Sequence, residues 1–199
     1  RHTPDSQKIY NALTLLISHN EIAEGNIEII VNDAQNWSVR FIPHQYPKAR
    51  DYKNGVKTHF YEAFRDNPNA KVKRLNLKKT VSEYINKNNI YEVIYVYKGL
   101  ISEGSRSNIF FIKDQTFYTP PVSQILPGIT REVVCELIEH AGYHLIEKAL
   151  FREEAFQFET TFLTGTSPGV LPVEFIDNIR YNTHNQHLNH IMSLYNKAL

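Results

Sequence analysis

The chain has 199 residues, of which 42% are hydrophobic and 22% are charged, the composition of an ordinary globular protein. Collagen, coiled coils and wholesale disorder are therefore excluded. The 22 Lys and Arg residues nearly balance 21 Asp and Glu residues, so the net charge of +1 predicts no general attraction to nucleic acid or to an anionic membrane. No apolar run approaches the roughly 18 residues that a membrane span needs, and no signal peptide is visible.

The single cysteine, Cys135, excludes an intrachain disulfide and a cysteine-rich zinc site, and it is consistent with a reducing, cytoplasmic environment. Because Cys135 lies among Val133, Val134 and Leu137, we expect it in the core and not in catalysis. The chain begins at Arg1 without Met, and we expect it to be a fragment or to have lost its first segment.

Apolar residues three and four apart predict helices along the chain, whereas alternation and β-branched runs predict strands. In chain order, the pattern predicts a helix (5–18), a hairpin of two strands (26–31 and 37–42), a connector (43–55), a strand (56–64), a turn (66–69), a helix (76–88) and a buried strand (91–97). It then predicts a second hairpin (108–112 and 116–119), a helix that opens at 128–131 and ends at 142, a strand (144–146), a short helix (152–156), two strands (160–163 and 170–176) and a final helix (184–199). This mixture indicates an α+β fold with a strand-rich centre.

The connector holds two Pro and one Gly, which favours a boundary between subdomains. We expect a small, incomplete N-terminal subdomain at residues 1–50 and a larger C-terminal subdomain at residues 51–199.

Two motifs favour other chemistries and are rejected. Gly165, Ser167 and Gly169 match the G-x-S-x-G pattern of a hydrolase nucleophile elbow, but an elbow needs a helix directly after the Ser. Pro168 and the β-type run that follows predict instead a tight turn that offers hydroxyl and N–H groups to an anion.

Three histidines lie three residues apart on the final helix, at His184, His187 and His190. Their spacing falls short of a full turn at each step, so the outer pair diverges, and no carboxylate nearby completes a metal-binding set. We expect a solvated helix face and no metal site.

Four segments have no specific meaning when each is considered alone, but their order along the chain is informative. They are Val72–Asn76, Ser102–Asn108, Leu126–Arg131, and Thr164–Ser167 followed by Leu171–Val173. Together they resemble closely the fold-type IV pyridoxal-phosphate enzymes. This family includes branched-chain aminotransferases, D-amino-acid aminotransferases and aminodeoxychorismate lyases. The resemblance runs from about residue 55 to the C-terminus and more faintly through the first fifty residues, and it implies the two-subdomain D-amino-acid aminotransferase-like fold.

The resemblance assigns roles to single residues. It implies that Lys73 forms the Schiff base with pyridoxal phosphate, that Glu103 holds the protonated pyridine nitrogen, and that Leu126 packs on the ring. The remaining positions are implied to bind the cofactor phosphate or the substrate carboxylate: Gly128, Ile129, Thr130, Thr166 and Ser167.

Physical chemistry supports these assignments. A Lys that acts as an amine nucleophile must be able to lose its proton, which a neighbouring cation such as Arg74 favours. The cofactor accepts electrons only while its ring nitrogen is protonated, and a carboxylate such as Glu103 favours that cation. A dianionic phosphate suits the N-terminus of a helix that opens on Gly128, because unpaired N–H groups and the positive dipole end coincide there.

Two positions depart from the family pattern. The family carries an Arg near the start that reaches the phosphate, and Arg1 lies near that place, although His2 fits the spacing to Ser6 as well. Arg106 replaces a small or polar residue, and it has either a structural role or a role in binding an acidic substrate.

The resemblance therefore implies an enzyme that transfers an amino group between an amino acid and a 2-oxo acid, acts as a homodimer, and is located in the cytoplasm. One alternative is an aminodeoxychorismate lyase that releases pyruvate and 4-aminobenzoate. A second alternative is a non-catalytic protein that has kept the fold.

Overall fold

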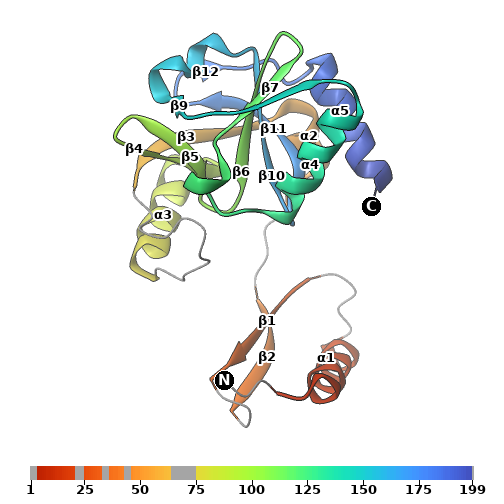
Figure 1. The fold of residues 1–199 in the computed structure, drawn as a ribbon. Coiled ribbons are helices and arrows are strands. Elements are labelled where there is room, and N and C mark those ends of the chain that lie inside the picture. The colour runs from red at the N-terminus through yellow and green to blue at the C-terminus, as the bar shows by residue number, and fades with distance from the viewer. Residues whose placement is uncertain (1–3, 21–24, 33–35, 43–45, 64–74, 199) are drawn as a thin grey trace. The chain divides into compact units, whose positions relative to one another are not determined.

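The computed structural model describes residues 4–20, 25–32, 36–42, 46–63 and 75–198 (Figure 1). Contacts divide the chain into two compact units, Arg1–Tyr46 and Pro47–Leu199. Among the described residues, no helix is both long enough and apolar enough to cross a membrane.

The smaller unit consists of helix α1 (Ser6–Asn20) and an antiparallel hairpin of β1 (Asn26–Val31) and β2 (Trp37–Ile42). The helix begins where the Asp5 carboxylate accepts the backbone N–H of Gln7 at 2.8 Å. On the hairpin, the Arg40 guanidinium donates to the Glu28 carboxylate at 2.6 Å. The helix and both strands were predicted from hydrophobic patterning, and the structure confirms them.

The larger unit is built on a mixed sheet with the order β8-β7-β6-β10-β11-β3-β4-β5-β9, and β12 pairs with β11. Pairs β11–β3, β3–β4 and β7–β8 are parallel, and the other pairs are antiparallel. The strands are β3 (Val56–Glu62), β4 (Glu92–Tyr97), β5 (Leu100–Gly104), β6 (Asn108–Lys113), β7 (Thr116–Thr119), β8 (His144–Glu147), β9 (Leu150–Phe151), β10 (Thr160–Gly165), β11 (Gly169–Ile176) and β12 (Ile179–Arg180).

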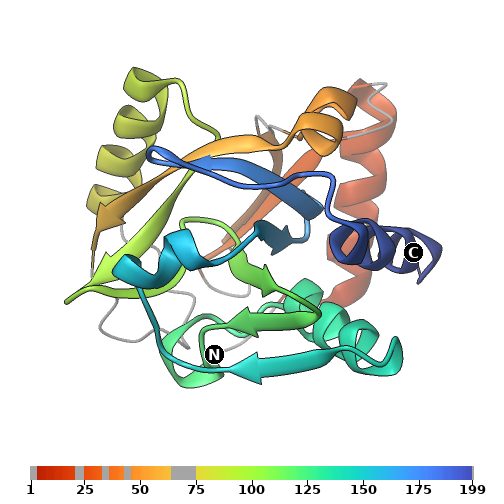
Figure 2. The same ribbon diagram turned by 90° about the horizontal axis from the view of Figure 1, so that it is seen from above.

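Helices cover this sheet (Figure 2). They are α2 (Ala49–Asn54), α3 (Leu75–Asn88), α4 (Ile129–His140) and α5 (Gln186–Ala198), with 3₁₀ turns at Val122–Gln124 and Arg152–Gln157. The predicted helices near residues 76, 128 and 184 are confirmed. The predicted turn at 66–69 lies outside the described residues.

The prediction that residues 43–55 form only a connector is wrong, because α2 occupies Ala49–Asn54. This helix has no apolar stripe that patterning could detect. It begins where the Asp51 carboxylate accepts the backbone N–H of Lys48 at 2.7 Å, and the Tyr52 hydroxyl donates to the Pro168 carbonyl at 2.9 Å.

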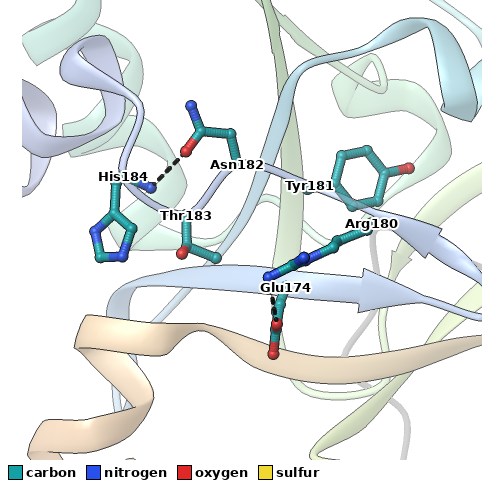
Figure 3. Close-up of a pocket in the computed structure, with 6 residues that line it drawn as sticks. All are labelled: Glu174, Arg180, Tyr181, Asn182, Thr183 and His184. Atoms are coloured by element: carbon teal, nitrogen blue, oxygen red, sulfur yellow. Dashed lines mark hydrogen bonds and ion pairs between the residues drawn. The ribbon is translucent and has the colours of Figure 1, made fainter.

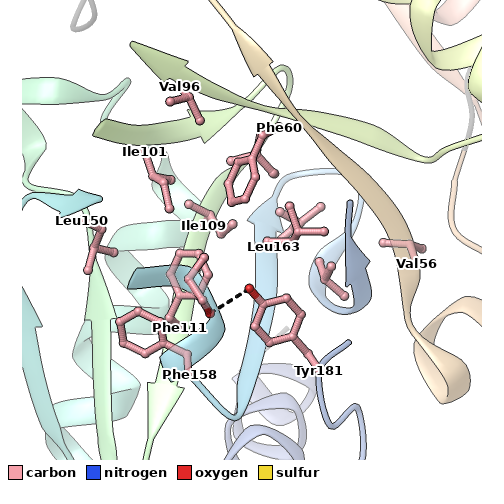
Figure 4. Packing of buried hydrophobic residues seen from close by; sticks show 14 of the residues in the cluster. Val56, Phe60, Val96, Ile101, Ile109, Phe111, Leu150, Phe158, Leu163 and Tyr181 are labelled. Atoms are coloured by element: carbon pink, nitrogen blue, oxygen red, sulfur yellow. Dashed lines mark hydrogen bonds between the residues drawn. The ribbon is translucent and has the colours of Figure 1, made fainter. Parts of the chain in front are cut away.

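Alternating side chains of the strands divide the apolar residues into an inner and an outer set. The inner core, drawn in Figure 4, includes Ile94 and Val96 of β4 and Ile109 and Phe111 of β6. On the outer face, Phe110 and Ile112 pack with Val134 of α4 and Leu188 of α5. Val93 and Tyr95 pack with Val81 of α3. The sheet thus curls around one core while the helices cover its outside.

The curl brings β5 and β6 into contact although they are not hydrogen-bonded neighbours in the sheet. Strand β9 pairs only with Leu100 and Ile101 of β5, so Ser102–Gly104 have no hydrogen-bonded strand on the edge away from β4. Strand β7 pairs with β6 only from Phe111 onward, so Asn108–Phe110 have no hydrogen-bonded strand on the edge away from β10. We call this meeting of the two uncovered strand halves the β5–β6 seam.

The fold predicts that the stacked pair Phe110–Phe162, whose ring centroids lie 5.0 Å apart, contributes strongly to stability. Phe162 is fully buried. We expect Phe162→Ala to lower the free energy of unfolding by about 3–5 kcal/mol, because it leaves a cavity that the core cannot fill. Urea denaturation measures this. The control Phe156→Ala removes the same group from a side chain that is 69% exposed, and it should cost no more than about 0.5 kcal/mol.

Candidate functional site

The Glu103 carboxylate lies at the β5–β6 seam and is only 2% exposed. Its Oε2 accepts the backbone N–H of Leu126 at 3.0 Å and the Asn108 amide at 3.5 Å. A buried carboxylate needs such donors, because losing water without replacing its hydrogen bonds is costly. The Glu103 side chain is therefore fixed against the segment that leads into α4.

Asn108, the first residue of β6, holds that segment from the other side. Its Nδ2 donates to the Leu126 carbonyl at 2.9 Å, while the same nitrogen faces Glu103. Leu126 thus donates through its N–H to one seam residue and accepts through its carbonyl from the other. Both polar groups of this backbone unit are occupied, which fixes the position of Leu126.

The N-terminus of α4 follows two residues later. Gly128 is the N-cap residue, and no side chain caps the helix there. A Cβ at Gly128 would lie 2.3 Å from Asn108 Oδ1, so any larger residue would collide with the amide. Thr130 is buried, and Ile129 is 78% exposed. The first backbone N–H groups of α4 and its positive dipole end are suited to bind an anion.

The turn at Thr166–Pro168 joins β10 to β11, as expected for a tight turn and not for a nucleophile elbow. Thr166 and Ser167 are exposed on it. The turn lies near the start of α4, because Thr164 of β10 is directly opposite Asn108 across the strands. The Thr164 hydroxyl is buried and has no hydrogen-bond partner among the residues that the structure describes.

The structure therefore brings together Glu103, Leu126, Gly128 and Thr130, and it places the Thr166–Ser167 turn beside them. Arg106 lies on the loop between β5 and β6. Its guanidinium is 5.3 Å from the Tyr91 ring centroid, and it donates to the Tyr91 carbonyl at 3.1 Å. Burial raises the pKa of Tyr91 to about 12, and Arg106 opposes that rise. Lys73 and Arg1 lie outside the described residues.

A second buried carboxylate, Glu92 of β4, was missed by the motif analysis. It is 1% exposed and accepts from Ser105 Oγ at 3.0 Å, from Ser107 Oγ at 2.9 Å and from the backbone N–H of Arg106. Glu92 therefore holds the loop between Glu103 and Asn108. A charged residue inside the buried run 91–97 was the available signal.

The structure has two hollows that are not lined by Glu103, Leu126 or Gly128. One, of about 310 Å³, is lined by the ion-paired Glu174 and Arg180 and by residues 181–184 (Figure 3). The other, of about 340 Å³, is lined by Thr166 and Ser167 of the turn and by Tyr52 and Tyr195.

The prediction that three histidines lie on the final helix is wrong for His184, which lies in the turn before α5. His184 and His190 are exposed, but His187 is half-buried, and its ring makes an edge contact with the Tyr143 ring. The Tyr143 hydroxyl also lies 2.9 Å from His190 Nδ1. In the part of the chain that the structure describes, no group of three His, Cys, Asp or Glu residues is placed to hold a metal ion. Cys135 is half-buried, and burial raises the pKa of its thiol to about 11.

The burial of Glu92 predicts a specific pH dependence. Desolvation raises the pKa of Glu92, which Arg106 and the hydrogen bonds from the loop only partly oppose. A carboxyl with a raised pKa in the fold stabilises the fold below its unfolded pKa, and it loses that contribution as pH rises through the folded pKa. We expect Glu92→Gln to match or exceed the parent in stability at neutral pH and to lose that advantage in acid, as measured by urea unfolding across the pH range.

The control for this series is Glu92→Leu, which leaves the Arg106 N–H without its acceptor and should be less stable than Glu92→Gln by about 1–3 kcal/mol at every pH, because neither side chain titrates. A parent that gains stability over Glu92→Gln as pH rises would contradict the raised pKa.

Comparisons with known proteins show which family the chain belongs to. The family model described as amino-transferase class IV matches residues 1–176. A branched-chain-amino-acid aminotransferase of Pseudomonas aeruginosa is 41% identical over 80 residues, which are 40% of this chain and 26% of that enzyme. A D-alanine aminotransferase of Bacillus licheniformis is 40% identical over 88 residues, which are 44% of this chain and 31% of that enzyme.

The matched stretches thus span about a third or less of these curated relatives. The crystal structure of the Escherichia coli branched-chain amino acid aminotransferase matches this chain with a TM-score of 0.76 and 23% sequence identity. The match covers 98% of this chain and 73% of that enzyme's chain. That enzyme has the same fold. With the match to the family model extending over residues 1–176, the chain belongs to the class IV aminotransferase family.

Proposed function

We propose that this chain belongs to a pyridoxal-phosphate-dependent enzyme that transfers an amino group between an amino acid and a 2-oxo acid. The observation that carries the proposal is the pairing of the buried Glu103 carboxylate with the uncapped N-terminus of α4, both tied to Leu126 and Asn108. One end of this site favours a cation and the other an anion. Pyridoxal phosphate carries a protonated ring nitrogen and a phosphate, which match these two ends.

The described residues fit this cofactor. No described side chain caps the start of α4 at Gly128, so its first backbone N–H groups are available to a phosphate. The hydroxyl of Thr130 adds a donor at the same end, and Thr166 and Ser167 supply further hydroxyl and N–H groups from the neighbouring turn. The buried hydroxyl of Thr164 is a further polar group of this region that none of the described residues satisfies.

When bound, the cofactor supplies a protonated aromatic ring that accepts the electron pair released at the substrate Cα. Glu103 holds the proton on the ring nitrogen, because its negative charge stabilises the pyridinium cation. The α4 N-terminus would hold the phosphate, and Leu126 would pack against the ring. Lys73 would be the residue that carries the cofactor, and its amine would move the proton to and from Cα as general base and acid.

The remaining assignments belong to the same proposal. Arg1 adds a positive charge at the phosphate, and Thr166 and Ser167 also face the substrate carboxylate. Arg106 either binds an acidic substrate from the loop beside Glu103 or has the structural role that its contacts with Tyr91 support. The enzyme works as a homodimer in the cytoplasm, with amino acids and 2-oxo acids as its small-molecule partners.

The first test is the visible absorption spectrum of the protein purified with pyridoxal phosphate. We expect a pH-sensitive band that is absent in Lys73→Ala, and borohydride reduction followed by peptide mapping should find the cofactor on Lys73. Glu103→Gln should retain covalent attachment but lose most turnover, because the neutral amide no longer favours the ring cation. A parent protein with no band and no labelled lysine would support a non-catalytic protein instead.

The reaction itself needs a separate test, because the Ser105–Asn108 stretch resembles both the D-amino-acid aminotransferases and the lyases of the family. We expect oxo-acid formation from at least one donor in a panel of L- and D-amino acids with a 2-oxo acid acceptor. No turnover of any donor, together with pyruvate release from aminodeoxychorismate without an acceptor, would establish the lyase alternative. Lys73→Ala is the control for both reactions.

A further inference from the structure

The Asn108 side chain lies between the two ends of the proposed cofactor site. Its Nδ2 is 2.9 Å from the Leu126 carbonyl and 3.5 Å from Glu103 Oε2, both of which are acceptors. Its Oδ1 lies against the backbone of Gly128, where a Cβ would be 2.3 Å away. Turning the amide over would place its oxygen against two other oxygens, so hydrogen bonding fixes its orientation.

Asn108 is also anchored firmly. It is 5% exposed, and β6 pairs it with Thr164 of β10. Two residues further along β6, Phe110 is fully buried in the outer cluster that includes Val134 of α4. The strand that carries the amide is therefore packed against the helix whose N-terminus the amide contacts.

We propose that Asn108 is a positioning residue that sets the spacing between the Glu103 carboxylate and the N-terminus of α4. This inference rests on the proposed function and deepens it. A ligand with a cationic ring nitrogen and a phosphate gains affinity by engaging both groups at once only when their separation matches its own length. Neither Glu103 nor α4 alone fixes that separation. Asn108 contacts both and also holds Leu126 between them.

We expect substitution of Asn108 to weaken the binding of pyridoxal phosphate more than it weakens the binding of pyridoxal alone or of inorganic phosphate alone. The probes are pyridoxal phosphate, pyridoxal without the phosphate, and inorganic phosphate, each titrated into the purified protein. In Asn108→Ala and Asn108→Asp we expect the affinity for pyridoxal phosphate to fall by about tenfold or more, the range typical of residues that orient a binding group. In Asn108→Ala the affinity for pyridoxal and for inorganic phosphate should each change by less than about threefold. Asn108→Asp adds a negative charge beside the start of α4, so it should also weaken the binding of inorganic phosphate.

Asn108→Asp keeps the size of the side chain, so it guards against a variant that fails because of a cavity. It replaces the Nδ2 donor with an oxygen that faces the Leu126 carbonyl and Glu103, and it should lose at least as much affinity for pyridoxal phosphate as Asn108→Ala. All titrations are run below the melting temperature of each variant.

The matched control is Asn185→Ala. Asn185 is also a buried asparagine, and its Oδ1 accepts the N–H groups of His187 and Leu188 at the start of α5, at 2.9 and 3.2 Å. Its loss should lower the melting temperature and leave the affinity for pyridoxal phosphate unchanged. This control separates a loss of general stability from a loss of spacing.

Two results overturn the inference: unchanged affinity of the Asn108 variants for pyridoxal phosphate, or an equal loss for all three probes that follows the loss of stability. The failure of the proposed function is a different result, because in that case the parent protein itself does not bind pyridoxal phosphate.

Discussion

Two carboxylates are buried at the end of the inner core, and their need for hydrogen-bond donors organises the polar part of the structure. Glu92 is 1% and Glu103 is 2% exposed. A carboxylate without water must be given donors by the protein. Glu92 takes its donors from the loop that joins β5 to β6, and Glu103 takes them from Leu126 and Asn108. The electrostatic requirement thus fixes two segments that have no regular secondary structure.

The same requirement links the site to the fold. The loop that Glu92 holds connects Glu103 directly to Asn108, and Asn108 in turn contacts the start of α4. Gly104 lies within this arrangement, where a Cβ would be 2.2 Å from Ser107 Oγ. The hydrogen bonds to the Glu92 carboxylate therefore constrain the loop, and the loop in turn constrains Asn108. Because Asn108 contacts Gly128, the position of the α4 N-terminus depends on the same set of contacts.

Local patterns predicted the parts of the structure that depend on local chemistry. The hairpin at 26–42 and the opening of α4 were predictable, because alternation, turn residues and helix starts act over a few positions. The family resemblance assigned Glu103 and Leu126 to one site, and in the structure the Leu126 N–H donates to the Glu103 carboxylate. Strands β9 and β12 have two residues each and carry no pattern, and α2 has no apolar stripe.

The contacts of Asn108 could not be predicted for a different reason. They depend on which strands the curl of the sheet brings together, and a single sequence does not contain that information. Glu92 was hidden in the same way, since its partners lie 13 to 15 positions further along the chain. The roles of Lys73 and Arg1 stay predictions, because both residues lie outside the described part of the chain.

The β5–β6 seam has a consequence for the effect of single substitutions. Elsewhere in the sheet, strands are joined by main-chain hydrogen bonds, which do not depend on the identity of the side chains. At the seam, Ser102–Gly104 and Asn108–Phe110 have no strand between them, and the Glu103 and Asn108 side chains make the contact. A single substitution at either position therefore removes a connection that no main-chain hydrogen bond replaces. The sheet can stay folded while the geometry of the site is lost.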